Sequence, residues 1–88
     1  MSFSIRIKGS AARELRRIAQ ADRRRLVEAI GRLSENPFLG NALRGELRGL
    51  RRLRVGDYRV LYNVQNEALI VLVVRVAHRR DVYRRGMR

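Results

Sequence analysis

The chain has 88 residues, the length of one small domain, and 45% of them are hydrophobic, which is enough for one core. Lysine and arginine number 21 against 8 acidic residues, so the formal net charge is +13, and Lys8 is the only lysine. The absence of cysteine excludes disulfide scaffolds, zinc ribbons and thiol catalysis, and a single histidine excludes sites built on several histidines.

The charge also indicates the kind of partner. Arginine favours phosphate because its planar guanidinium donates two hydrogen bonds at once, so we expect a polyanionic partner. The first nine residues alternate and contain no apolar segment of the kind found in signal peptides. The longest apolar run, residues 68–74, is far shorter than the roughly 20 residues that a membrane span needs. These features predict a cytoplasmic protein with no membrane partner.

The first half of the chain predicts one strand and two helices. Residues 3–7 alternate between apolar and polar side chains, which indicates a half-buried strand. Ser10 predicts the N-cap of a first helix and Asp22 the N-cap of a second. Asn36-Pro37 ends the second helix, because the residue before proline avoids the helical region. The apolar residues at helical spacing are Ala11, Leu15, Ile18 and Ala19 in the first helix and Leu26, Ile30 and Leu33 in the second.

The second half predicts an irregular connection and then three strands. Residues 38–49 contain three glycines and no regular period, which is typical of a connection. Gly56-Asp57 predicts a tight turn between the first two strands. The last strand is apolar at successive positions, so we expect other elements to cover both of its faces. The predicted strands are residues 50–55, 58–64 and 68–76, and a polar tail follows at 77–88.

Together these elements predict an α+β fold. The order is β-α-α-β-β-β, in one domain that spans residues 1–88. The two helices form a hairpin that covers one face of a mostly antiparallel four-stranded sheet. The other face of the sheet is expected to stay partly open, where it offers a platform for a ligand.

The chain lacks the motifs of several enzyme classes, namely the Gly-x-Ser-x-Gly elbow, the P-loop and the dinucleotide-binding glycines. Its acidic residues are scattered, which argues against a carboxylate cluster that holds metal ions, so we expect neither a metal nor another cofactor. Cleavage of a phosphodiester without metal favours RNA, because RNA carries its own nucleophile, the 2′-hydroxyl. Attack by that oxygen would leave a 2′,3′-cyclic phosphate and a free 5′-hydroxyl.

Such a reaction needs cations around the phosphate, a group that accepts a proton and a group that donates one. Arginine supplies the cations, but it stays protonated and cannot act as the base. The titratable side chains near the end of the chain are His78, Asp81 and Tyr83. The arginines predicted to bind RNA are Arg51, Arg52, Arg54, Arg80, Arg84 and Arg85, and strand alternation puts Arg52 and Arg54 on one face.

Two segments of the chain carry a family pattern. Residues 50–62 read Leu-Arg-Arg-Leu-Arg-Val-Gly-Asp-Tyr-Arg-Val-Leu-Tyr, and residues 76–83 read Val-Ala-His-Arg-Arg-Asp-Val-Tyr. Together and in this order, they resemble the RelE family of bacterial and archaeal toxins, within the wider RelE/ParE group. The resemblance covers nearly the whole chain, and Asn36-Pro37 is also typical of the family.

The resemblance implies a toxin that enters the ribosomal A site, cuts the mRNA there, and is held inactive by an acidic RelB-like antitoxin encoded alongside it. In that case Arg59 would hold the scissile phosphate. Arg79 would stabilise the transition state or protonate the leaving oxygen. Tyr83 would stack on a base or orient the 2′-hydroxyl. Some well-studied relatives carry lysines on the strand at residues 50–55, where this chain has arginines, so the identity of the base stays open between His78, Tyr83 and no single residue.

Two other functions stay open from the sequence. One is a ParE-like toxin that inhibits DNA gyrase, a binding module on the same fold, although ParE members generally lack the histidine, arginine and tyrosine found within residues 78–83. The other is a non-catalytic protein that binds RNA or the antitoxin. These functions differ in whether mRNA is cut.

Overall fold

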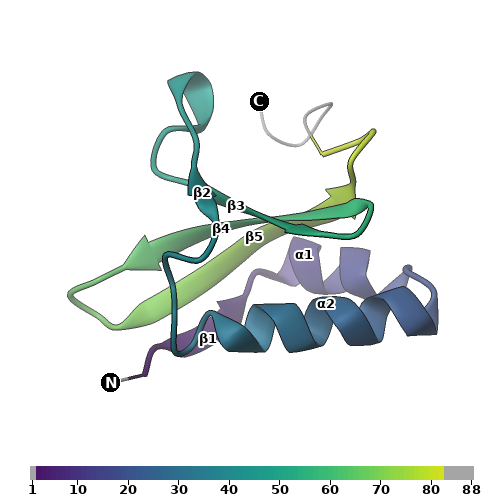
Figure 1. Ribbon diagram of the computed structural model, residues 1–88, viewed down its shortest axis with the longest axis horizontal. Coiled ribbons are helices and arrows are strands. Elements are labelled where there is room, and N and C mark those ends of the chain that lie inside the picture. Colours follow the sequence, from purple (N-terminus) through teal and green to yellow (C-terminus); the bar gives the residue numbers. More distant parts are fainter. Residues whose placement is uncertain (1, 83–88) are drawn as a thin grey trace.

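Two helices pack against one face of a five-stranded mixed sheet, so the α+β prediction is confirmed (Figure 1). The computed structural model describes residues 2–82. Neither helix in this part of the chain is long and apolar enough to cross a membrane. In chain order the elements are β1 (Ser4–Ile7), α1 (Gly9–Arg16), α2 (Gln20–Arg32), β2 (Asn41–Ala42), the 3₁₀ helix η1 (Gly45–Leu47), β3 (Arg51–Val55), β4 (Tyr58–Gln65) and β5 (Ile70–His78).

The strands lie in the order β1-β5-β4-β3-β2, with β1 parallel to β5 and every other pair antiparallel. The predicted count of four strands is therefore wrong by one. The additional strand, β2, has only two residues, Asn41 and Ala42, which pair with Arg52 and Arg51. Two residues are too few to show a period of two, so β2 left no signal in the sequence.

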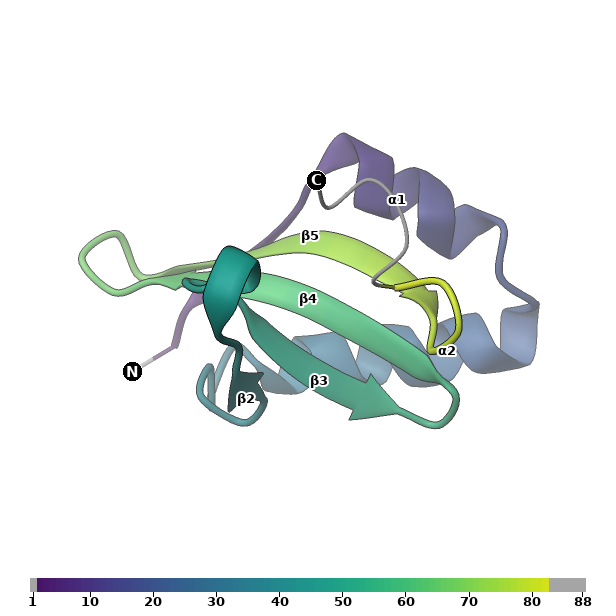
Figure 2. The ribbon, with the colours of Figure 1, turned by 90° about the horizontal axis from the view of Figure 1, so that it is seen from above.

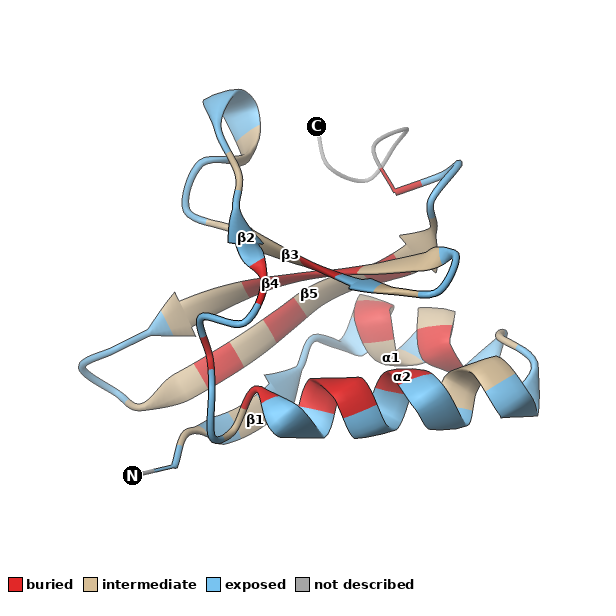
Figure 3. Cartoon of the chain, in the orientation of Figure 1, coloured by how far each residue is buried: buried red, intermediate tan, exposed pale blue. Residues whose placement is uncertain are grey.

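The helices bury their apolar stripes against one face of the sheet and do not cover the other face (Figure 3). This core contains the predicted helical residues Leu15, Leu26 and Leu33 together with Val60 and Val73 from the sheet, all of them buried. Ile18, although predicted within the same stripe, is only partly buried because it lies beyond the end of α1.

The helix boundaries differ from the sequence prediction at both N-termini. The N-cap positions are Lys8 and Ala19, and neither side chain makes a capping hydrogen bond. Ser10 and Asp22 lie instead within the first turns, where the charge of Asp22 favours the positive end of the helix dipole. The first helix also ends earlier than predicted, at Arg16, and an arginine from α2 bonds the carbonyls at its end: Arg23 Nη1 donates to Ile18 O at 3.0 Å and to Arg16 O at 3.3 Å.

A buried tyrosine anchors the connection between α2 and β3. The Tyr62 hydroxyl donates to Pro37 O at 2.8 Å and accepts from Gly40 N at 2.9 Å. Gly40 has no room for a side chain, because a Cβ there would lie 2.5 Å from Arg52 O. Arg51 donates to Gly40 O through Nε at 3.1 Å and Nη2 at 2.6 Å, so the connection is held from two sides.

A shift in register between β4 and β5 changes which way the end of β5 faces. Tyr62 lies opposite Val73, but Leu61 lies opposite Arg75, so Val74 is an extra residue on β5. Strict alternation from Val73 would turn Arg75 toward the helices. The extra residue turns Arg75 to the open face and Val76 into the core instead.

Replacing Tyr62 with phenylalanine should lower the free energy of unfolding by about 1–3 kcal/mol, because the buried Gly40 N–H and the Pro37 carbonyl lose their partner. Chemical denaturation measures this change. Tyr58→Phe, at a half-buried position, is the matched control and should shift the free energy by less than about 0.5 kcal/mol. Equal stability of the Tyr62→Phe variant and the wild type would contradict the anchoring role.

Candidate functional site

The open face of the sheet gathers arginines from three neighbouring strands. Residues directly opposite one another in antiparallel strands share a face. Leu53, Val60 and Val76 form one such row and face the helices. The next rows on either side therefore face away from the helices, and their members are Arg54, Arg59 and Ala77 in one row and Arg52, Leu61 and Arg75 in the other.

Two segments rise from the sheet on this same open side (Figures 1 and 2). One runs from β2 through η1, and the other is the turn that follows β5. The first segment carries the exposed arginines Arg44 and Arg48, which are not among the arginines predicted to bind RNA. The arginine side chains on the open face and on these segments repel one another. The face is therefore suited to bind an anion that lies across the sheet.

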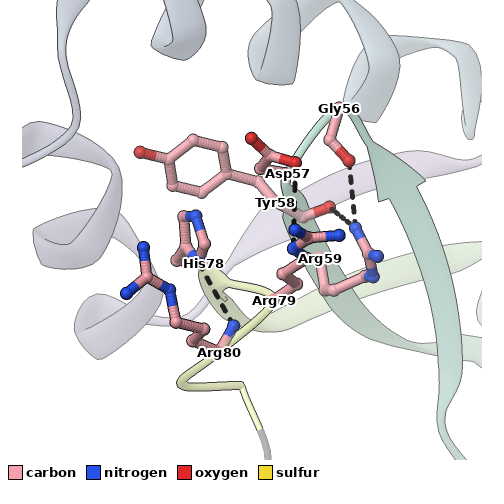
Figure 4. Close-up of polar contacts among 7 residues, drawn as sticks. All are labelled: Gly56, Asp57, Tyr58, Arg59, His78, Arg79 and Arg80. Carbon is pink, nitrogen blue, oxygen red and sulfur yellow. Dashed lines mark hydrogen bonds and ion pairs between the residues drawn. The ribbon is translucent and has the colours of Figure 1, made fainter.

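The turn after β5 is attached to the turn between β3 and β4 (Figure 4). Arg79 N donates to Asp57 O at 2.7 Å, and Arg79 Nε lies 3.9 Å from Asp57 Oδ1. Asp81 N and Val82 N both donate to His78 O, at 2.8 and 3.1 Å. Val82 is fully buried, but it is not part of the core between the helices and the sheet, so it packs on the other side of the sheet.

Arg59 and Arg79 bind adjacent residues of the turn between β3 and β4. Arg59 Nη1 donates to Gly56 O at 3.1 Å and to Tyr58 O at 2.9 Å, while Arg79 pairs with Asp57. The Arg79 and Asp57 side chains are 62% and 66% exposed, and an ion pair so exposed contributes only about 0–1 kcal/mol. A phosphate can therefore compete with Asp57 for Arg79 at little cost.

The structure places His78 apart from this pair. His78 lies opposite Tyr58, in a row that faces the helices, and the two rings meet edge to face with centroids 5.6 Å apart. Its Nδ1 accepts the Arg80 amide at 3.2 Å (Figure 4). Ala77, which lies opposite Arg59, and His78 are successive residues of β5 and point to opposite faces, so His78 and Arg59 lie on opposite faces of the sheet. The predicted catalytic role of His78 stays a prediction.

The predicted RNA-binding arginines divide into different environments. Arg51 lies opposite Tyr62 and donates hydrogen bonds to Gly40 O, before β2. Its guanidinium also lies 5.2 Å from the centre of the Phe38 ring. Arg54 is exposed on the open face, and Arg52 is half-buried there. Arg80 is exposed in the turn after β5. Tyr83, Arg84 and Arg85 lie outside the described residues, so their predicted roles stay predictions.

Arg75 also belongs to the open face, although it was not among the predicted site residues. Arg75 is the only charged residue of segment 68–77, and that isolation was the available signal. Its direction could not be inferred, because it depends on the extra residue Val74. Among residues 2–82, no three histidine or carboxylate side chains gather closely enough to hold a metal ion.

Comparison with known proteins decides the family. A family model described as the ParE toxin of the type II toxin-antitoxin system parDE matches residues 5–83. Toxin RelG of Mycobacterium tuberculosis is 39% identical over 87 residues, which cover 97% of this chain and 100% of that protein. The chain belongs to the RelE/ParE family of type II toxins.

Solved structures give the same result for the fold of this RelE/ParE toxin. The toxin-antitoxin complex RelBE2 of Mycobacterium tuberculosis contains a chain with a TM-score of 0.83 and 35% identity, over 89% of this chain and 99% of that one. The RelBE complex of Escherichia coli contains a chain with a TM-score of 0.76 and 26% identity, over 88% and 96% of the two chains. The predicted RelE-like architecture is thereby confirmed.

Arg51 and Arg54 lie in different environments on β3 of this RelE/ParE toxin, so we expect their substitutions to have different effects on RNA binding and on stability. Arg54→Gln should lower the slope of log affinity against log salt for single-stranded RNA by about 0.7 for each phosphate that Arg54 neutralises. Arg51→Gln should leave that slope unchanged and lower the free energy of unfolding, because Gly40 O loses its donor. RNA titrations at several salt concentrations and chemical denaturation measure the two effects. An Arg51→Gln variant with the reduced slope and normal stability would refute this division.

Proposed function

We propose that this RelE/ParE toxin is an endoribonuclease that cuts mRNA in the ribosomal A site without a metal ion. The observation that carries the proposal is the open face, where Arg52, Arg54 and Arg59 lie beside the turn that bears Arg79. Such a face supports phosphate binding and stabilisation of the added negative charge in a phosphoryl-transfer transition state. Action on ribosomes would place this activity in the cytoplasm.

In the proposed reaction the 2′-hydroxyl of the mRNA attacks the adjacent phosphorus. A new bond from the 2′-oxygen to phosphorus forms, and the bond from phosphorus to the 5′-oxygen breaks. Arg59 holds the non-bridging oxygens, after exchanging its contacts with Gly56 O and Tyr58 O for the phosphate. Arg79 stabilises the charge that develops on the phosphate and on the leaving oxygen, and that oxygen takes its proton from Arg79 or from water. The products are a 2′,3′-cyclic phosphate and a 5′-hydroxyl.

The proton balance needs a base for the 2′-hydroxyl and an acid for the 5′-oxygen. The arginines of β3 stay protonated, so they bind and polarise the phosphate and cannot take the first proton. His78 lies in a row that faces the helices and accepts the Arg80 amide at Nδ1, which favours Tyr83 over His78 as the side chain that meets the 2′-hydroxyl. If no single residue acts as the base, the 2′-hydroxyl transfers its proton directly to solvent or to the phosphate itself.

We also propose an acidic RelB-like antitoxin as the partner that inhibits this toxin. Relatives of the same fold were solved as toxin-antitoxin complexes, and the net charge of +13 favours an acidic chain. Co-expression with the protein encoded by the neighbouring reading frame tests this proposal. An acidic protein that co-purifies and dissociates at high salt is the expected result, and its failure to bind would refute the proposal.

The decisive experiment uses ribosomes programmed with a defined mRNA and purified toxin. Cleavage should occur at the A-site codon, and the fragments should carry a 2′,3′-cyclic phosphate and a 5′-hydroxyl. A single 2′-deoxynucleotide at the cut position should abolish cleavage there, because it removes the nucleophile. Cleavage of the deoxy-substituted message at the same bond would exclude attack by the 2′-hydroxyl.

Arg59→Ala and Arg79→Ala should each lower the rate of mRNA cleavage by roughly two to three orders of magnitude, because each removes a cation from the transition state. Arg32→Ala removes an exposed arginine at the end of α2 and is the matched control, with the rate expected to stay at the wild-type value. Circular dichroism verifies that all three variants fold. Full activity of either Arg59→Ala or Arg79→Ala would remove that residue from the mechanism.

The match to the parDE family model keeps inhibition of DNA gyrase as a second candidate function. Induction of the toxin would then cause DNA damage and leave the mRNA intact. Primer extension on cellular mRNA, together with a reporter of DNA damage, separates the two functions. Damage without cleavage would replace the nuclease proposal with the gyrase proposal.

A further inference from the structure

The outer edge of β5 changes its partner part-way along the strand. β1 pairs with β5 only as far as Val73, and Lys8 N donates to Val73 O at 2.9 Å as the chain leaves the sheet. The chain then turns into α1, and a side chain of that helix accepts a hydrogen bond from the part of β5 that β1 does not reach. Glu14 Oε1 accepts the Val76 amide at 2.7 Å, where a longer β1 would have supplied a carbonyl.

The second oxygen of the same carboxylate pairs with Arg75. Glu14 Oε2 lies 3.2 Å from Arg75 Nε, and the two side chains are 32% and 13% exposed. The pair is therefore more enclosed than the pair between Arg79 and Asp57, which is 62% and 66% exposed. An enclosed arginine that loses its counter-charge is costly, so Glu14 determines where the Arg75 guanidinium lies.

The other end of the guanidinium reaches the turn that follows β5. Arg75 Nη2 donates to Asp81 O over 3.5 Å, a long hydrogen bond. Asp81 lies two residues after Arg79 in that turn, and Val82 beside it is fully buried. A chain of contacts thus runs from α1 through Glu14 and Arg75 to the segment that carries Arg79.

We propose that Glu14 and Arg75 are positioning residues, which hold the turn at 79–82 and with it Arg79 over the open face. The proposal rests on the nuclease function only where it concerns the rate of cleavage. Glu14 acts through Arg75, and Arg75 acts through the Asp81 carbonyl, so neither residue has to touch RNA. Glu14 also offsets the repulsion of Arg75 by the other arginines of the face.

The guanidinium is suited to this position because its planar fork serves two partners at once. The guanidinium forms an ion pair with Glu14, with Nε 3.2 Å from Oε2, while Nη2 donates a long hydrogen bond to the carbonyl of Asp81. A lysine would place one ammonium group between them and could not hold both in fixed directions. Without the carboxylate, the Arg75 side chain is drawn to the RNA phosphate or to solvent, and the turn loses one of its attachments.

The test is Glu14→Gln, which keeps an oxygen for the Val76 amide and removes the charge that orients Arg75. In ribosome-programmed cleavage, kcat should fall roughly tenfold to a hundredfold with KM nearly unchanged, because the binding arginines stay in place and Arg79 is misplaced. Independently of activity, hydrogen exchange at the amides of Arg79, Asp81 and Val82 should become roughly tenfold faster.

Two further variants make the test specific. Glu28→Gln removes an exposed carboxylate of α2 by the same chemical change, and it should alter neither kcat nor exchange. Arg75→Gln should reproduce the effects of Glu14→Gln, and the double variant should be no worse than Arg75→Gln alone, because Glu14 acts through Arg75. Additive effects in the double variant would contradict the proposed order of action.

The outcomes separate this proposal from the nuclease proposal. If no variant and no wild-type protein cleaves mRNA, the nuclease function is wrong, and faster exchange in Glu14→Gln still supports the positioning role. If the wild type cleaves mRNA and Glu14→Gln matches it in both kcat and exchange, the positioning role is wrong and the nuclease function stands. A fall in activity with unchanged exchange at 79–82 also overturns the positioning role, as does a rise in KM alone.

Discussion

The register shift between β4 and β5 determines the surface chemistry of this toxin. With Val74 as an extra residue, Arg75 lies on the open face, and Val76 completes the core. Without it, a guanidinium would point into the apolar layer beneath two helices, at a cost of several kcal/mol for an unpaired buried charge. The same shift turns His78 toward the helices. A single inserted residue therefore separates the arginines from the histidine.

The arginine face forms because two short helices can cover only one side of the sheet. The covered side takes the leucines and valines, and the uncovered side takes the guanidinium groups of three adjacent strands. These cations repel one another, and exposed backbone carbonyls and the carboxylates of Asp57 and Glu14 hold them only in part. The folded protein thus keeps an unbalanced positive surface, which an RNA phosphate or an acidic chain can neutralise.

The turn after β5 is held in place although it has no large core of its own. Residues 79–82 are attached through the Asp57 carbonyl, the His78 carbonyl and the Arg75 side chain, and Val82 supplies the one fully buried side chain. Attachments of this kind are individually weak, so the turn is held by their number. On the opposite flank, Tyr62 and Arg51 anchor the chain before β2 in the same manner.

Local patterns in the sequence were sufficient for the order of the main elements, the apolar stripes of the helices, the turn at Gly56-Asp57, and the face shared by Arg52 and Arg54. Each of these depends on neighbours within a few residues, where a period of two or of 3.6 is visible. The strand β2, the role of Arg51 and the directions of Arg75 and His78 were decided by tertiary structure. They depend on partners far along the chain, such as Glu14 for Arg75 and Tyr62 for Gly40, and on one bulge that no local period records.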